Sequence, residues 1–161
     1  MTPLLVLCVG NPILGDDGLG PRVAEALAED GGLPPGAVVE CGFTGGLDLL
    51  PAVEGAERLI LVDAVDIGER PGAVLCFDSP DIPMGFGRPI SPHQVAVSDV
   101  LALARLRGTA PKRLALVGVQ VERVGLGLEL TPAVAAAVPH ACAVVRSEAR
   151  RLLAGTNGDA P

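Results

Sequence analysis

Short apolar runs alternate along the chain with longer segments in which apolar residues recur at helical spacing. The runs contain almost no polar positions, which is typical of strands that are buried on both faces. The expected strands are residues 4–9, 37–40, 58–62, 72–77 and 114–121. The expected helices are a segment around Pro21, a short one from about Leu47, residues 95–107, and a terminal segment after Thr131-Pro132. Strands that alternate with helices predict an α/β fold with three layers, in which helices cover both faces of a mostly parallel five-stranded sheet.

Glycine and proline mark the expected connections. Residues 78–92 contain four prolines and two glycines, which favours an irregular surface loop. Pro139 is expected to break or kink the terminal helix, because proline lacks the N–H that a helix interior requires. The length of 161 residues fits one domain, here residues 1–154, followed by a flexible polar tail at 155–161.

Composition narrows the class of protein. Hydrophobic residues make up 49% of the chain, which excludes intrinsic disorder. The formal charge of −7 argues against a nucleic-acid partner. No apolar run approaches the ~20 residues that cross a bilayer, and Met1-Thr2-Pro3-Leu4 has no basic region, so we expect a soluble protein without a signal peptide. The four cysteines are far apart and are expected to be reduced, buried thiols.

Polar residues near the ends of strands are the candidates for chemistry, because ligands of parallel sheets bind beyond the carboxyl ends of the strands. Asp16 and Asp17 follow the first strand, Asp63 ends the third, and His93 stands just before a helix. Asp17, Asp63 and His93 can converge at one edge of the sheet. Two carboxylates and an imidazole bind a borderline divalent metal and leave coordination positions open.

Other interpretations of these residues stay open. Residues 10–20 lack both the Gly-x-Gly-x-x-Gly and the Gly-Lys-Ser/Thr pattern, so they do not predict a nucleotide loop. Asp16 or Asp17 can simply cap the helix that follows. A cysteine hydrolase that uses Cys41 as nucleophile and His93 as base is a further alternative.

The stretch Gly10-Asn11-Pro12-Ile13-Leu14-Gly15-Asp16-Asp17-Gly18-Leu19-Gly20-Pro21 closely resembles the opening motif of the NiFe hydrogenase maturation proteases. The Gly42–Gly46 loop, Leu61-Val62-Asp63-Ala64, Ser91-Pro92-His93-Gln94 and the segment from Leu130 to Pro139 follow in the order expected for that family. The resemblance covers essentially the whole chain. It implies a twisted sheet between helices, of the phosphorylase/hydrolase-like type.

The resemblance implies a cytoplasmic endopeptidase that removes the C-terminal extension of a hydrogenase large-subunit precursor after nickel insertion. An acid of the first motif, an aspartate after the third strand and a histidine bind the metal in this family, and these positions fall on Asp17, Asp63 and His93. The first acid is often glutamate in relatives. Nickel would arrive on the precursor, and another divalent metal can occupy the site in the isolated protein. The expected substrate-binding residues are Asn11, Thr44, Gly45 and Gly46.

Two mechanisms follow from this assignment. In one, nickel held by the precursor completes its coordination with the three side chains, which positions the scissile peptide and polarises its carbonyl or activates a water. In the other, nickel serves only for recognition, and Asp17 or Asp63 is the general base. We favour metal-dependent positioning with carboxylate assistance, in an enzyme of a family catalogued among aspartic-type peptidases. A non-catalytic, nickel-dependent maturation chaperone would use the same ligands.

Overall fold

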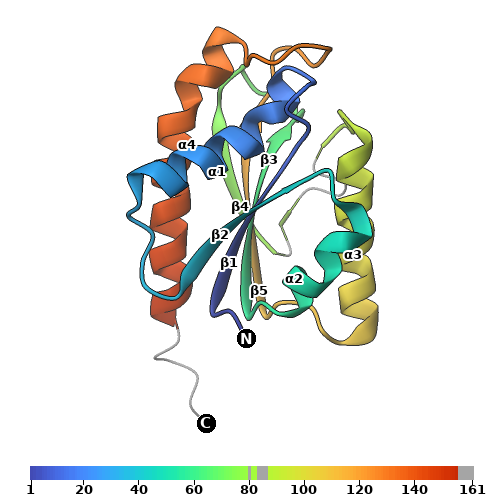
Figure 1. Ribbon diagram of the computed structural model, residues 1–161, viewed down its shortest axis with the longest axis vertical. Coiled ribbons are helices and arrows are strands. Elements are labelled where there is room, and N and C mark those ends of the chain that lie inside the picture. The colour runs from blue at the N-terminus through green and yellow to red at the C-terminus, as the bar shows by residue number, and fades with distance from the viewer. Residues whose placement is uncertain (80, 83–86, 156–161) are drawn as a thin grey trace.

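The computed structural model describes residues 1–79, 81–82 and 87–155 of the chain (Figure 1). The strands are β1 (Leu4–Val9), β2 (Ala37–Phe43), β3 (Arg58–Val65), β4 (Val74–Asp78) and β5 (Arg113–Gln120). The α-helices are α1 (Leu19–Asp30), α2 (Leu50–Glu54), α3 (Pro92–Arg107) and α4 (Pro132–Ala154). Two 3-10 helices, η1 (Asp16–Gly18) and η2 (Gly46–Leu49), precede α1 and α2. The expected tail lies outside the described residues from 156 onward.

The strands form one sheet in the order β2-β1-β3-β5-β4, and β4 is its antiparallel member. This confirms the predicted α/β class with a mostly parallel sheet. The chain passes from β1 to the edge strand β2 and then to β3 on the other side of β1. The order of the strands therefore reverses at β1, and open α/β sheets bind ligands beyond the strand ends at such a point.

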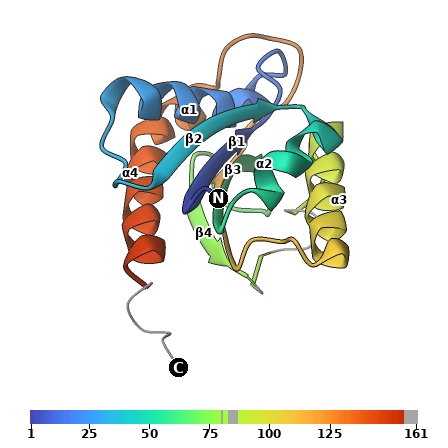
Figure 2. The ribbon, with the colours of Figure 1, turned by 60° about the horizontal axis from the view of Figure 1, so that its bottom comes forward.

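Helices cover both faces of the sheet, with α1 and α4 on one side and α2 and α3 on the other (Figures 1 and 2). Both faces of β1 are buried, because its alternate side chains enter two separate cores. Leu4, Val6 and Cys8 pack in the core beneath α1 and α4. Leu5, Leu7 and Val9 pack in the core beneath α2 and α3. The continuous apolar runs of the sequence thus correspond to strands buried on both sides.

Two local expectations are wrong. Helix α4 continues through Pro139. Proline has no N–H to donate to the carbonyl of Ala135, one turn earlier in the helix. Pro139 and Ala135 are both exposed, so water can donate to that carbonyl instead. Cys76 is exposed, because it lies on the edge strand β4, whereas Cys8 and Cys142 are buried as expected.

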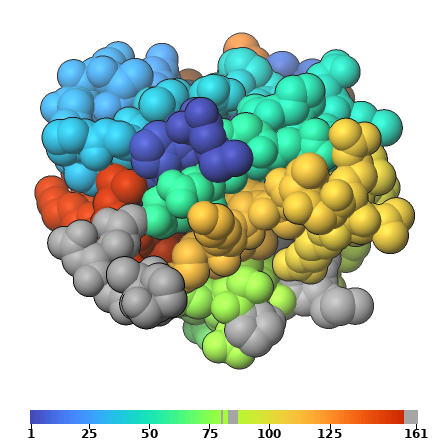
Figure 3. All heavy atoms as spheres, turned by 90° about the horizontal axis from the view of Figure 1, so that it is seen from below, coloured from blue at the N-terminus to red at the C-terminus, as the bar shows by residue number. Residues whose placement is uncertain are grey.

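Figure 3 shows the end of the molecule at which the N-terminal residues emerge between the layers. The carboxyl ends of β1 and β3 lie at the opposite end. Glycine permits the close approach of α1 to this carboxyl end. A Cβ added at Gly20 would lie 2.0 Å from the carbonyl oxygen of Val9. Within the described part of the chain, no helix combines the length and apolar character needed to cross a bilayer.

Candidate active site

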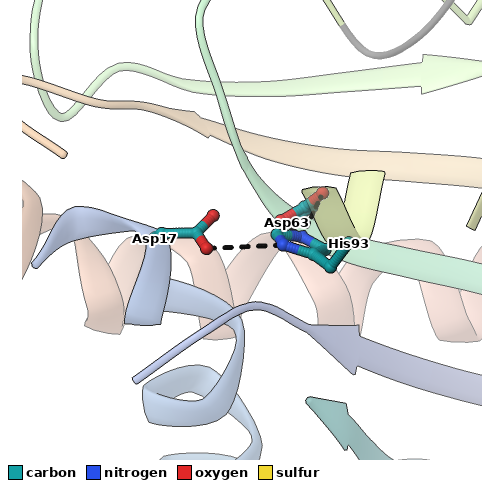
Figure 4. A group of neighbouring side chains, drawn as sticks. All are labelled: Asp17, Asp63 and His93. Atoms are coloured by element: carbon teal, nitrogen blue, oxygen red, sulfur yellow. Dashed lines mark hydrogen bonds and ion pairs between the residues drawn. The ribbon is translucent and has the colours of Figure 1, made fainter. Parts of the chain in front are cut away.

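Asp17, Asp63 and His93 meet beyond the ends of β1 and β3 (Figure 4). The His93 ring lies between the carboxylates, with Nδ1 3.3 Å from Asp17 Oδ2 and Nε2 3.1 Å from Asp63 Oδ1. One potential ligand atom from each residue lies within 4.8 Å of the other two. All three residues are buried. The predicted convergence of these residues is therefore found in the structure.

Asp17 is held by the loop that connects β1 to η1. Gly10 has a φ of +148°, and a Cβ there would lie 2.1 Å from the carbonyl oxygen of Asp17, so only glycine lets the loop close. The backbone N–H of Asn11 donates to Asp17 Oδ2 at 3.1 Å. Asp17 Oδ1 is buried and has no hydrogen-bond partner among the described residues. A buried, unpaired carboxylate oxygen is costly, which suggests that it accepts a group absent from the isolated chain.

Asp16 points away from this cluster. Its Oδ2 accepts hydrogen bonds from the backbone N–H groups of Glu122 and Arg123, both at 2.9 Å. Its Oδ1 accepts one from the N–H of Thr131 at 2.7 Å, and the Thr131 hydroxyl contacts both oxygens. Neither aspartate caps η1 or α1 through its side chain, so the capping interpretation is wrong. Asp16 instead ties the loop that carries Asp17 to the 122–131 connection.

Asp63 lies within β3, which ends at Val65 and not, as expected, before Asp63. Its side chain belongs to the face that packs against α3, where Gln94 Nε2 donates to Asp63 Oδ2 at 3.1 Å. Burial raises the pKa of Asp63, and its hydrogen bonds to His93 and Gln94 act in the opposite direction. These polar partners allow a carboxylate to occupy an otherwise apolar strand.

His93 lies in the first turn of α3, because the helix begins at Pro92 and not at residue 95. Proline is favoured at this first position, where its missing N–H has no helical partner. Ser91 does not cap the helix backbone, and its hydroxyl contacts His93 Nδ1. Burial acts to lower the pKa of His93, but the hydrogen bonds to Asp17 and Asp63 outweigh it and raise this pKa to about 9.

The donor set suits a divalent cation. It offers carboxylate oxygens, an imidazole nitrogen and the unpaired Asp17 Oδ1, with no thiolate among the three residues. Such ligands match a borderline metal and not a structural zinc centre of the cysteine type. In the metal-free protein the proton on His93 offsets part of the charge of the two carboxylates, so a bound cation would take the place of that proton.

The four residues expected to bind substrate lie on two loops at the same end of the sheet. The Asn11 side chain accepts a hydrogen bond from the N–H of Ile13, within its own loop. Thr44, Gly45 and Gly46 follow β2, which extends to Phe43 and not only to residue 40. A Cβ at Gly46 would lie 3.7 Å from that of Ala96 on α3, which places this loop beside the helix that carries His93. Their role in substrate binding stays a prediction.

Cys41 does not form a pair with His93. Cys41 packs against the core beneath α1 and α4, whereas both ring nitrogens of His93 contact Asp17, Asp63 or Ser91. Burial also raises the pKa of the Cys41 thiol, the opposite of what a nucleophilic thiolate requires. The geometry therefore gives no support to the cysteine-hydrolase alternative.

Gln94 and Ser91 are site residues to which the sequence reasoning assigned no role. Both are buried and contact the triad, Gln94 through Asp63 and Ser91 through His93. The available signal was their position beside His93 together with the start of a helix at Ser91-Pro92. That start places His93 and Gln94 in the first turn, close to the end of β3.

Comparison with known proteins identifies the family. A family model described as "Hydrogenase maturation protease" matches residues 21–148. The HupD hydrogenase expression/formation protein of Rhodobacter capsulatus is 42% identical over 149 residues, which are 91% of this chain and 71% of that protein. The hydrogenase 2 maturation protease of Escherichia coli is 38% identical over 139 residues, which are 86% of this chain and 85% of that protein.

Solved structures agree with the sequence comparisons. The hydrogenase maturating endopeptidase HybD from E. coli superposes with a TM-score of 0.84 at 36% identity and covers 92% of this chain and 93% of its own. The [NiFe] hydrogenase maturation protease HybD from Thermococcus kodakarensis gives a TM-score of 0.75 at 27% identity, and the match covers 91% of this chain and 99% of that protein. The chain belongs to the hydrogenase maturation protease family and is an endopeptidase of hydrogenase maturation.

Proposed function

We propose that this endopeptidase acts in the cytoplasm and removes the C-terminal extension of a NiFe hydrogenase large-subunit precursor once nickel has been inserted. The observation that carries the proposal is the convergence of Asp17, Asp63 and His93, three buried groups with a donor set suited to a divalent metal. The metal is part of the substrate in this proposal and arrives with the precursor.

The surface around the triad fits a protein substrate. Large apolar side chains are exposed on the elements that surround the carboxyl end of the sheet, namely Ile13, Phe43, Leu47 and Val95. Ile13 follows β1, Phe43 ends β2, Leu47 lies in η2 and Val95 lies in the first turns of α3. Because the substrate of an endopeptidase is a protein, exposed apolar side chains at the end of the sheet that carries the triad are candidates for contact with it. The precursor would cover them when it docks.

Phe43 is conformationally unusual among these residues. It is the only non-glycine residue with positive φ in the described chain, at +46°, and the pairing of β1 with β2 shifts register at this point. Its carbonyl accepts a hydrogen bond from the N–H of Gly10, at the start of the loop that carries Asp17. Strained residues cluster at functional sites. This supports a role for the end of β2 and the Thr44-Gly45-Gly46 loop in binding the precursor.

The triad would recognise the metal of the precursor through exchange of ligands. His93 must lose the proton that its carboxylate partners stabilise, and one of its ring nitrogens then becomes a ligand. Among the described residues Asp17 Oδ1 has no partner that it must lose, whereas both oxygens of Asp63 already accept hydrogen bonds from His93 or Gln94. The metal supplies charge that polarises a nearby carbonyl or activates water.

For the hydrolytic step, Asp17 is the better-placed general base. When Asp63 and His93 alone hold the metal, Asp17 Oδ1 is not a ligand and can accept a proton from a water that attacks the scissile carbonyl, while Oδ2 stays bound to Asn11 N–H. Asp63 and His93 would hold the metal and, through it, the scissile peptide. This is metal-dependent positioning with carboxylate assistance. Recognition alone, with Asp17 or Asp63 as base, is the second form of the same proposal.

The proposal is tested with purified enzyme and nickel-loaded precursor, with release of the C-terminal extension followed by mass spectrometry. Asp17→Asn, Asp63→Asn and His93→Ala should each lower the rate about a hundredfold or more. His140 is the other histidine of the chain and is exposed on α4, so His140→Ala is the matched control and should keep the wild-type rate. Wild-type rates in the three site variants would contradict the assignment.

A further inference from the structure

Gln94 is a buried polar side chain that the mechanism above does not use. It is 1% exposed and lies one residue after His93 in α3. Its Nε2 donates to Asp63 Oδ2 at 3.1 Å and to the carbonyl oxygen of Ala64 at 2.7 Å. Its Oε1 accepts from the backbone N–H of Ile90 at 3.0 Å. One amide therefore connects β3 with the chain that leads into α3.

These contacts allow only one orientation of the amide. The Ile90 N–H is a donor and must face Oε1, whereas the Ala64 carbonyl is an acceptor and must face Nε2. A flipped amide would set a donor against a donor and an acceptor against an acceptor. Gln94 consequently always presents an N–H to Asp63 and cannot accept a hydrogen bond from it.

We propose that Gln94 is a positioning residue that fixes the rotation of the Asp63 carboxylate by holding Oδ2, so that Oδ1 faces His93 and the metal of the substrate. His93 Nε2 lies 3.1 Å from Asp63 Oδ1 and 3.3 Å from Oδ2, whereas Gln94 contacts Oδ2 alone, so rotation of the carboxylate plane would break the hydrogen bond from Gln94. Residues that orient metal ligands in this way commonly contribute about 10–100-fold to metal affinity or activity. The inference rests on the proposed function of Asp63.

The chain contains a matched control for this residue. Gln120 is also a buried glutamine, 4% exposed, and its Nε2 donates to Asp66 Oδ1 and to the Val121 carbonyl oxygen, both at 3.1 Å. Its Oε1 accepts from the N–H groups of Ile67 and Glu69. Gln120 has the same kinds of partners as Gln94, but it orders the turn after β3 and contacts none of the three site residues. Loss of its amide therefore measures the purely structural cost.

The experiment compares Gln94→Met with Gln120→Met, because methionine keeps the length of glutamine and removes its hydrogen bonds. For each variant, kcat and KM are determined from the rate at which nickel-loaded precursor is processed, and stability is determined from urea unfolding. We expect both variants to unfold at lower urea. Gln94→Met should lower kcat by about 10–100-fold with little change in KM, whereas Gln120→Met should stay within about twofold of wild type.

Two further variants separate the possible outcomes. Gln94→Glu keeps the acceptor for Ile90 N–H and replaces the Nε2 donor, which faces both Asp63 and the Ala64 carbonyl, by an oxygen. It should therefore lower kcat at least as much as Gln94→Met. In the Asp63→Asn variant, the additional change Gln94→Met should lower kcat by no more than about a further twofold, because both changes act on the same carboxylate. A wild-type kcat in Gln94→Met, equal losses in the two methionine variants, or additive losses in the double variant would overturn the inference. Full activity of Asp63→Asn alone would instead contradict the proposed function.

Discussion

Replacement of Asp16 or Asp17 by asparagine should separate stability from activity at two adjacent positions. Asp16 is 0% exposed and accepts hydrogen bonds from three backbone N–H groups and from the Thr131 hydroxyl. Asparagine offers one oxygen, so its NH₂ group must face either the Thr131 N–H or the N–H groups of Glu122 and Arg123. At least one buried donor then loses its acceptor, and the remaining bonds lose their ionic character.

The size of the effect follows from these contacts. An unsatisfied buried donor costs about 1–3 kcal/mol, and a hydrogen bond to a charged group is worth about 1 kcal/mol more than a neutral one. Asp16→Asn should therefore lower the free energy of unfolding by about 3 kcal/mol and the melting temperature by about 6–12 °C. We expect the folded variant to keep most of its activity.

Asp17→Asn should have the opposite profile. Its oxygen can still accept from Asn11 N–H, and its NH₂ group takes the place of Oδ1, which has no partner. The change also weakens the contact of Asp17 with His93 Nδ1, so we expect a loss of stability of about 1 kcal/mol, smaller than that of Asp16→Asn, whereas the rate should fall about a hundredfold. Thermal unfolding and processing of nickel-loaded precursor, both followed for the two variants, check this. An Asp16→Asn protein as stable as wild type, or an inactive but fully folded one, would refute the reasoning.

Three more predictions concern the site chemistry. The isolated protein should bind one Ni²⁺ weakly, and calorimetry should detect no binding by His93→Ala. This variant should stay folded, although loss of the buried ring lowers its stability, and His140→Ala should bind Ni²⁺ as the wild type does. Because the pKa of His93 is raised to about 9 and only the neutral ring is a ligand, Ni²⁺ affinity should rise with pH by up to about tenfold per unit below that value, and a pH-independent affinity would contradict this. Cys41→Ser should process the precursor at the wild-type rate, and an inactive, folded variant would restore the cysteine-hydrolase alternative.

The layers of the fold could be predicted from the sequence because the strands are buried on both faces and appear as continuous apolar runs. Residues 4–9 are an example, and they are the bounds of β1. The ends of other elements could not be predicted from local pattern. An acid within an apolar run normally marks the end of a strand, but β3 continues past Asp63, because Gln94 and His93 solvate its carboxylate from α3. Such partners are distant in sequence.

The three residues of the candidate site could be predicted from the sequence, but the residues that contact and orient them could not. Asp17, Asp63 and His93 each lie in a recognisable motif near the end of a predicted strand or the start of a predicted helix, and the topology brings them together. The different roles of Asp16 and Asp17 depend on the 122–131 connection, more than a hundred residues away, whose N–H groups capture only Asp16. The role of Gln94 could not be predicted from the sequence, because a polar residue in a helix normally faces solvent. The division into one domain and a flexible tail stays a prediction.

The central claim is that the enzyme cuts its precursor only when the triad can reach a metal carried by that precursor. The most direct measurement incubates wild-type enzyme with matched samples of nickel-loaded and nickel-free large-subunit precursor and follows the mass of the precursor with time. We expect loss of the C-terminal extension from the loaded precursor and an unchanged mass for the nickel-free one. Equal rates of cleavage for the two samples would contradict it.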